Sequence, residues 1–171
     1  EDTPLAGDRP DLSDRFPPLH SLDVVPNNLP VQLTTFVARD AELAQLVELM
    51  EHNRLVTLTG TGGCGKTRLA LQSAADVAHR HAGGVWWVDL APVRDPELVA
   101  AAVAEAVGLR EEHDRSLPET LAQELRDRDV LLVLDNCEQV LDGTARLLDV
   151  LLVDVPDLRV LATSREPLGV P

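Results

Sequence analysis

The sequence predicts an α/β fold in three layers, with helices on both sides of a mainly parallel sheet. Short apolar runs alternate with helical patterns along the chain, as is typical of parallel strands joined by crossover helices. One run, Val130–Asp135, is apolar at every position before its final carboxylate, as expected of a central strand buried on both faces. A glycine-rich segment, Gly60–Thr67, joins another apolar run to a helical pattern.

The expected helices and strands follow one another in a regular order. Asp40 is expected to cap the first helix. A capping box of Ser116 and Glu119 indicates the start of a later helix, and Gly108 ends the helix before it. The full set is helix 40–51, strand 55–59, helix 66–80, strand 85–90, helix 95–107, helix 116–126, strand 130–135, helix 144–153 and strand 159–162.

Composition excludes several classes of function. The chain is 44% hydrophobic and 26% charged, the balance of a globular protein. Its net charge of −14 repels phosphate backbones, which argues against direct binding of this segment to DNA or RNA. No apolar run approaches the roughly 20 residues of a membrane span, so we expect a cytoplasmic protein without membrane contact. Cys64 and Cys137 lack metal-ligand spacing and are interpreted as reduced thiols.

The N-terminal segment differs in composition from the rest of the chain. Six of its first 30 residues are proline, set among Asp, Ser and Asn, and such a composition resists helix and sheet. We therefore predict a Pro-rich interdomain linker over residues 1–28 and a folded domain over residues 29–171.

The glycine-rich segment matches the pattern G-x-x-x-x-G-K-[ST] in full, directly after a strand and directly before a helix. In such a phosphate-binding loop, glycines let backbone N–H groups turn toward the β-phosphate, and the helix N-terminus adds partial positive charge. The Lys66 ammonium would reach the β- and γ-phosphates, and the Thr67 hydroxyl would bind Mg²⁺. The predicted contacts of ATP or ADP here are Gly60, Thr61, Gly62, Gly63, Cys64, Gly65, Lys66, Thr67 and Arg68.

An acidic element closes the central strand. Asp135 is predicted to hold Mg²⁺ and, with Lys66, to take part in catalysis. Many active ATPases place a second acid at the next position, but this chain has Asn136, which can orient a water molecule and is unable to take its proton. Glu138 is either a substitute base or a solvated carboxylate at a helix start. We therefore expect slow hydrolysis.

Arg165 directly follows the last expected strand. Ligands bind outside the carboxyl ends of parallel strands, so this side chain is expected beside the loop and Asp135. There it would contact the γ-phosphate and distinguish ATP from ADP. The alternative is a surface arginine that pairs with one of the many acids.

Several ordered motifs resemble the nucleotide-binding, NB-ARC-like domain of STAND-class P-loop NTPases, in the branch of bacterial LuxR- and SARP-type transcriptional regulators. The resemblance covers about residues 28–171 and implies the three-layer P-loop NTPase fold. The motifs are residues 28–30, 36–42, 60–70, 132–138 and 162–168.

The same resemblance implies contacts and partners that the residue patterns alone do not indicate. The segment matching Phe36–Arg39 packs on adenine in such proteins, so Val37 and Arg39 are candidate base contacts, although Ala38 stands where the family usually has Gly. Family members carry a lid, repeats and an effector further along, which implies a domain incomplete at its C-terminus and lacking the lid. Other domains of the same chain, and nucleotide-dependent self-association, are the implied partners. Residues 16–23 also resemble the junction that follows an adenylyl cyclase domain in some members.

Three functions are consistent with these observations. The first is a nucleotide-dependent switch in a multidomain signalling or transcriptional regulator, with slow ATP hydrolysis at most. The second is an active ATPase or phosphotransferase that uses the same loop. The third is an interaction module whose loop is vestigial, which the intact motif argues against.

Overall fold

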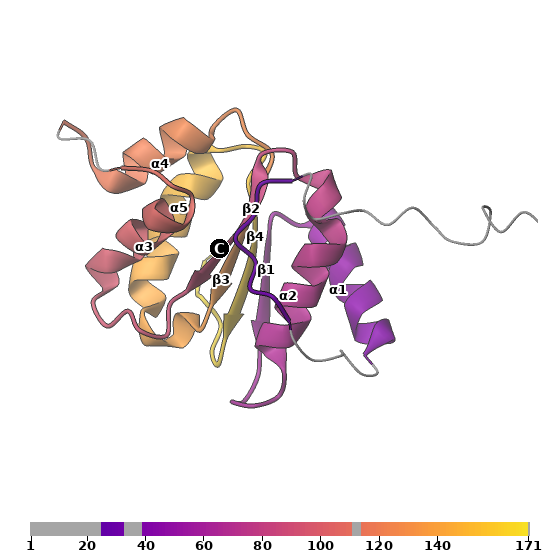
Figure 1. Cartoon of the computed structure of the whole chain (residues 1–171). Helices are drawn as coiled ribbons and strands as arrows, with labels where there is room; N and C mark the ends of the chain where they lie inside the picture. Colours follow the sequence, from indigo (N-terminus) through magenta and orange to yellow (C-terminus); the bar gives the residue numbers. More distant parts are fainter. Residues whose placement is uncertain (1–24, 33–38, 111–113, 171) are drawn as a thin grey trace, which may run out of the picture.

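A four-stranded sheet forms the centre of the computed structural model, which describes residues 25–32, 39–110 and 114–170 (Figure 1). The strands lie in the order β1-β4-β3-β2, and every pairing between neighbours is parallel. Their bounds are β1 Leu55–Thr59, β2 Gly84–Asp89, β3 Val130–Asp135 and β4 Arg159–Ser164. The predicted parallel sheet is confirmed, and all six residues of β3 are buried between two neighbouring strands and two layers of helices.

Helices cover both faces of the sheet (Figure 1). One face carries α1 (Asp40–His52) and α2 (Lys66–Val77), and the other carries α3 (Val99–Ala106), α4 (Leu117–Leu125) and α5 (Leu141–Asp154). Single 3₁₀ turns complete the set: η3 Ala78–Arg80, η4 Pro96–Leu98 and η5 Cys137–Gln139.

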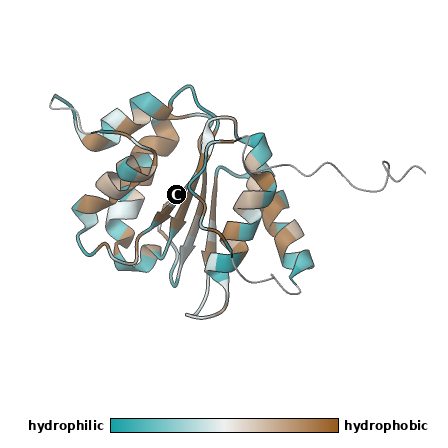
Figure 2. Ribbon diagram, viewed as in Figure 1, coloured by the Kyte–Doolittle hydropathy of each residue, from teal (hydrophilic) through white to brown (hydrophobic). Residues whose placement is uncertain are grey.

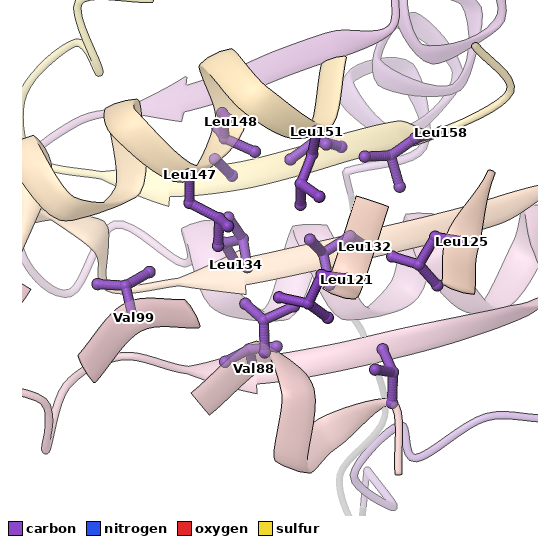
Figure 3. Close-up of a cluster of buried hydrophobic side chains, with 14 of the residues drawn as sticks. Val88, Val99, Leu121, Leu125, Leu132, Leu134, Leu147, Leu148, Leu151 and Leu158 are labelled. Atoms are coloured by element: carbon purple, nitrogen blue, oxygen red, sulfur yellow. The ribbon is translucent and has the colours of Figure 1, made fainter. Parts of the chain in front are cut away.

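The side chains of β3 alternate between two cores because successive residues of a strand point to opposite faces. Leu131 and Val133 pack with α1 and α2, whereas Leu132 and Leu134 pack with the other three helices. Figure 2 shows apolar residues along the strands and on the inner sides of the helices. In Figure 3 the leucines of α5, such as Leu151, point toward those of β3. The core is aliphatic, as a chain with few aromatic residues requires.

Most expected helix starts are found at the predicted residues. Asp95 accepts a hydrogen bond from the backbone N–H of Glu97 at 3.0 Å, and the capping box of Ser116 and Glu119 is present. The prediction that Asp40 caps α1 is wrong. Arg39 occupies the N-cap without a side-chain bond, and Asp40 lies in the first turn, where a carboxylate still interacts favourably with the helix dipole.

Two elements extend beyond their predicted bounds. Helix α5 begins at Leu141 instead of residue 144 and so includes Gly143, which packs against the backbone of Pro96. Strand β4 continues to Ser164 because its last residues still pair with β1. Of the described residues, no helix combines the length and the apolar character that crossing a membrane requires.

A short stretch before the predicted domain start runs along the outer edge of β2. Asn27 forms a parallel bridge with Val85, whose N–H donates to the Pro26 carbonyl at 2.9 Å. The Asn28 side chain bonds to both backbone groups of Trp87, with Nδ2 2.9 Å from the carbonyl oxygen and Oδ1 2.5 Å from the nitrogen. These bonds occupy polar groups of β2 that a sheet edge leaves unpaired. Within the described residues, hydrogen bonds to the sheet therefore begin at Pro26, before the predicted start of the domain.

Two arginines at the amino-terminal edge of the sheet bind the ends of helices on opposite faces. Arg54, just before β1, donates to the carbonyls of Leu152 at 2.8 Å, Val155 at 2.5 Å and Leu158 at 3.4 Å, at and just beyond the end of α5. Arg159, at the start of β4, donates to the carbonyls of Met50 at 2.7 Å and Asn53 at 3.2 Å, at the end of α1. Carbonyls at a helix C-terminus lack partners within the helix, so both guanidinium groups act as caps.

We expect Arg54→Ala to lower the free energy of unfolding by about 2–4 kcal/mol, because three carbonyl groups lose a charged donor at once. Urea unfolding followed by circular dichroism measures this change. Arg126→Ala is the matched control, since Arg126 is exposed and donates a single 3.3 Å bond to Asp154 at the same helix end. Equal losses in the two variants would contradict a capping role for Arg54.

Candidate functional site

The glycine-rich loop joins β1 to α2 at the carboxyl edge of the sheet, the lower edge in Figure 1. Gly63 and Gly65 have φ angles of 79° and 86°, in the left-handed region that disfavours side chains. The Lys66 ammonium donates to the carbonyls of Gly60 at 2.7 Å and Thr61 at 2.9 Å. The lysine thus lies against the loop at the start of a helix, where partial positive charge and backbone N–H groups favour an anion.

Asp135 receives hydrogen bonds from three neighbouring segments. The Thr67 hydroxyl lies 2.9 and 3.0 Å from its two oxygens, and the Thr163 hydroxyl of β4 also donates to it. The Asn136 amide nitrogen donates to Oδ2 at 2.9 Å. The carboxylate is only 3% exposed, and this burial raises its pKa above the ordinary value, although the bonds from Thr163 and Thr67 oppose the shift. The charges of Asp89 and Glu138 raise the pKa further.

The oxygen atoms in this cluster are suitable ligands for Mg²⁺. A hydroxyl and a carboxylate are hard oxygen ligands, and Thr67 and Asp135 present one of each within hydrogen-bonding distance. Within the described ranges, no group of three or more His, Cys, Asp or Glu residues gathers as a metal site. Mg²⁺ fits such a sparse set because it usually takes one or two protein ligands together with phosphates and water.

Glu138 and Arg165 both line a pocket of about 320 Å³ beside the loop and form an ion pair there. The Arg165 Nε atom lies 3.4 Å from Glu138 Oε1, and the arginine side chain is 62% exposed whereas the glutamate is 14% exposed. The other carboxylate oxygen of Glu138 is buried and has no hydrogen-bond partner within the described part of the chain. The pocket is lined by Gly62, Gly63, Gly65, Lys66, Thr67, Asn136, Glu138 and Arg165.

Of the remaining predicted site residues, Arg39 lies near the loop and Arg68 lies outside the pocket. Arg39 pairs with Glu42 at 3.2 Å, yet its guanidinium also lies 3.5 Å from the position that a Cβ at Gly65 would occupy, so it does approach the loop. Arg68 lies in the first turn of α2, is exposed and does not line the pocket. Val37 lies outside the described residues.

Sequence reasoning missed two residues that the site contains. Thr163 donates to Asp135 and accepts from the backbone N–H of Asn136 at 3.0 Å. Asp89 is in register with Asp135 on the adjacent strand and accepts from the Asn136 side chain at 3.1 Å. Both are polar residues at the end of an apolar strand, which is the same signal that identified Asp135.

The two cysteines differ in their surroundings. Cys137 is fully buried, and this burial raises the pKa of its thiol to about 12. Cys64 is half-buried in the loop, with its sulfur 3.7 Å from the Lys66 ammonium. Thiolates are the reactive form of cysteine, so the two thiols should react unequally in the folded chain.

We expect iodoacetamide at pH 8 to alkylate Cys137 in the folded chain at least tenfold more slowly than Cys64, because the Cys137 thiolate is scarce and inaccessible. Mass spectrometry of digested samples measures both rates. The urea-unfolded chain is the control, in which both thiols should react. Alkylation of Cys137 at the rate of Cys64 would contradict its burial.

Comparison with known proteins provides independent information. The family model described as NB-ARC domain matches residues 39–167. An uncharacterized protein of Mycobacterium tuberculosis is 46% identical over 137 residues, which are 80% of this chain and 35% of that protein. Another protein of that organism, named as an HTH-type transcriptional regulator, is 50% identical over 121 residues, 71% of this chain and 14% of its own length. The chain therefore spans about a third or less of these relatives.

A solved structure resembles the fold. The STAND protein with a tetratricopeptide repeat sensor from Pyrococcus horikoshii superimposes with a TM-score of 0.56 at 16% identity, over 90% of this chain and 24% of that chain. At this identity the likeness concerns the fold alone. Together with the parallel sheet, it confirms the predicted three-layer P-loop NTPase fold.

Proposed function

Because the chain belongs to the NB-ARC domain family, we propose that it binds ATP or ADP with Mg²⁺ and acts as a nucleotide-dependent switch within a multidomain bacterial regulator. The resemblance to NB-ARC-like domains found in the sequence is confirmed by the family match. The observation that carries the proposal is the convergence on one pocket of the loop, Lys66, Thr67 and Arg165, with Asp135 bonded to Thr67.

Each residue has a distinct role in this proposal. Backbone N–H groups of the loop and the Lys66 ammonium bind the phosphates, and Thr67 and Asp135 hold Mg²⁺. When bound, the ion neutralises charge on the phosphate oxygens. Arg165 lies beside Gly62, with Nη2 3.4 Å from where a Cβ would stand, so it is within reach of the end of a phosphate chain that lies in the loop.

The switch depends on Arg165 and Glu138. A γ-phosphate would compete with the Glu138 carboxylate for the guanidinium, and ADP lacks that group, so ATP and ADP leave the pair in different arrangements. Other domains of the same protein would sense this difference. The relative named as an HTH-type regulator supports such a setting, which is cytoplasmic, with nucleic-acid binding left to other domains.

Calorimetric titration with ATP and with ADP, each with and without Mg²⁺, tests the proposal, and phosphate release is followed in the same samples. We expect both nucleotides to bind, with phosphate release slower than about one per minute, because the residue directly after Asp135 is Asn136 and not a carboxylate. Thr67→Val is the control, since it removes the hydroxyl at similar volume and should abolish the Mg²⁺-dependent part of the affinity. Absence of binding for both nucleotides would overturn the proposal in favour of a vestigial loop.

A second candidate function, an active ATPase or phosphotransferase, is favoured by one observation. Glu138 lines the pocket and has a buried carboxylate oxygen without a partner among the residues that the structure describes, so it could accept a proton from an attacking water or hydroxyl. Rapid phosphate release that Glu138→Gln abolishes would support this function over the switch. The exposed Glu124→Gln, which removes a carboxylate from α4 away from the pocket, is the matched control.

A further inference from the structure

Asn136 adopts an unusual backbone conformation directly after β3. Its φ of 60° and ψ of 45° lie in the left-handed region, and no other non-glycine residue in the described part of the chain has a positive φ. Asparagine tolerates this region better than most residues. Its backbone N–H donates to the Thr163 hydroxyl at 3.0 Å, which helps to hold the conformation. The turn directs the side chain back toward the end of the sheet.

The amide of Asn136 lies between two carboxylates. Its Nδ2 atom is 2.9 Å from Asp135 Oδ2 and 3.1 Å from Asp89 Oδ1. The parallel register of β2 and β3 places these two acids side by side, and Asp89 is itself held by the N–H of Ala91 at 2.9 Å. An amide nitrogen has two hydrogens to donate, one for each carboxylate, whereas the amide oxygen would be repelled by both. The nitrogen must therefore face the acids.

A carboxylate at position 136 would have no hydrogen to donate to either neighbour. It would instead add a third negative charge within about 3 Å of the other two acids, an arrangement that like charges disfavour. Asp135 is required for Mg²⁺ under the proposed function, but Asp89 contacts neither the loop nor Thr67 in any bond of the described residues. Within the described residues, Asp89 therefore accepts its hydrogen bonds from Asn136 and from the backbone of Ala91.

We infer that Asp89 is a positioning residue that requires an amide at position 136. This requirement excludes a carboxylate base from the position at which it would activate water. The pairing itself does not depend on nucleotide binding, but its effect on turnover rests on the proposed function. Exchanging the two side chains would keep a donor and an acceptor facing each other while moving the carboxylate to position 136.

A double-mutant cycle without nucleotide tests the pairing. It compares the thermal unfolding of wild type, Asp89→Asn, Asn136→Asp and the exchange variant D89N/N136D at pH 7.5. We expect Asn136→Asp to lower the midpoint by about 3 °C or more, and the exchange variant to recover at least half of this loss, because an amide on β2 can donate to the new carboxylate. Additive effects of the two substitutions would overturn the inference.

Phosphate release from Mg·ATP by the same four proteins tests the effect on turnover. In hydrolysis the water oxygen bonds to the γ-phosphorus, the bond from that phosphorus to the bridging oxygen of ADP breaks, and the water proton passes to the base. We expect the exchange variant to release phosphate at least tenfold faster than wild type and faster than Asn136→Asp. Equal rates in the exchange variant and Asn136→Asp would overturn the inference. If wild type binds no nucleotide, the proposed function fails separately, and the unfolding cycle alone decides the role of Asp89.

Discussion

Lys66→Ala is expected to bind Mg·ATP at least 100-fold more weakly than the wild-type chain, a loss of about 2.7 kcal/mol or more. The ammonium lies 2.7 and 2.9 Å from the carbonyls of Gly60 and Thr61, so the side chain both secures the loop and supplies its positive charge. Charge-assisted bonds from ammonium to phosphate are among the strongest in proteins, and alanine replaces none of them. Calorimetry of the variant measures the loss.

Arg80→Ala is the matched control for this experiment. It removes one positive charge from the end of the segment that follows α2, where Arg80 pairs with Glu51 far from the loop. Equal weakening in the two variants would contradict a local role for Lys66, because it would indicate that overall charge determines affinity. A second measurement is available because Lys66 is the only lysine in the sequence. An amine-acylating reagent can therefore modify only this side chain and the α-amino group, and ATP should protect the side chain.

Gly143→Val is expected to lower the free energy of unfolding by about 3 kcal/mol or more. A Cβ at this buried position would lie 2.3 Å from the carbonyl oxygen of Pro96 and 2.8 Å from two further backbone atoms of that residue. Backbone has no alternative rotamer, so α5 and η4 would have to separate. Urea unfolding measures the change in stability.

Gly108→Ala separates this steric effect from the general cost of replacing a glycine. Gly108 has a φ of 74° and nothing within 4 Å of the position of a new Cβ, so alanine there meets backbone strain without a clash. That strain costs about 1–2 kcal/mol. If Gly143→Val cost no more than Gly108→Ala, the close packing of α5 on η4 would not be a constraint on the fold.

Local sequence patterns predicted most of the helices and strands because these elements depend on residues that are neighbours in the sequence. The glycine-rich loop has its glycines, lysine and threonine at fixed spacing, and the buried strand Val130–Asp135 is apolar up to its final residue. The capping box of Ser116 and Glu119 is likewise confined to one turn. Such features are visible in a sequence because the contacts that form them span only a few residues.

The parts that the sequence did not reveal depend on which strands are neighbours. Asp89 meets Asp135 only because β2 pairs with β3 in that register, and Thr163 reaches the same carboxylate only because β4 lies on the other side. No local pattern specifies the strand order. The start of α5 was missed for a similar reason, since Gly143 is accommodated by its contact with Pro96, 47 positions earlier.

The two arginine caps lie at one edge of the sheet and bind helices on both of its faces. Arg54 binds the end of α5 and Arg159 binds the end of α1, and the two residues belong to adjacent strands or their edges. The N–H of Val160 donates to the Arg54 carbonyl at 2.7 Å and so links the two strands beside the caps. The glycine-rich loop lies at the opposite edge of the sheet (Figure 1). We therefore expect nucleotide to lower the rate of amide hydrogen exchange in the loop and in the segments after β3 and β4. At the edge that holds Arg54 and Arg159, the exchange rate should be low with and without nucleotide. Under the proposed function, a change of nucleotide would therefore alter the segments at the loop edge, and the opposite edge would keep its bonds to α5 and α1.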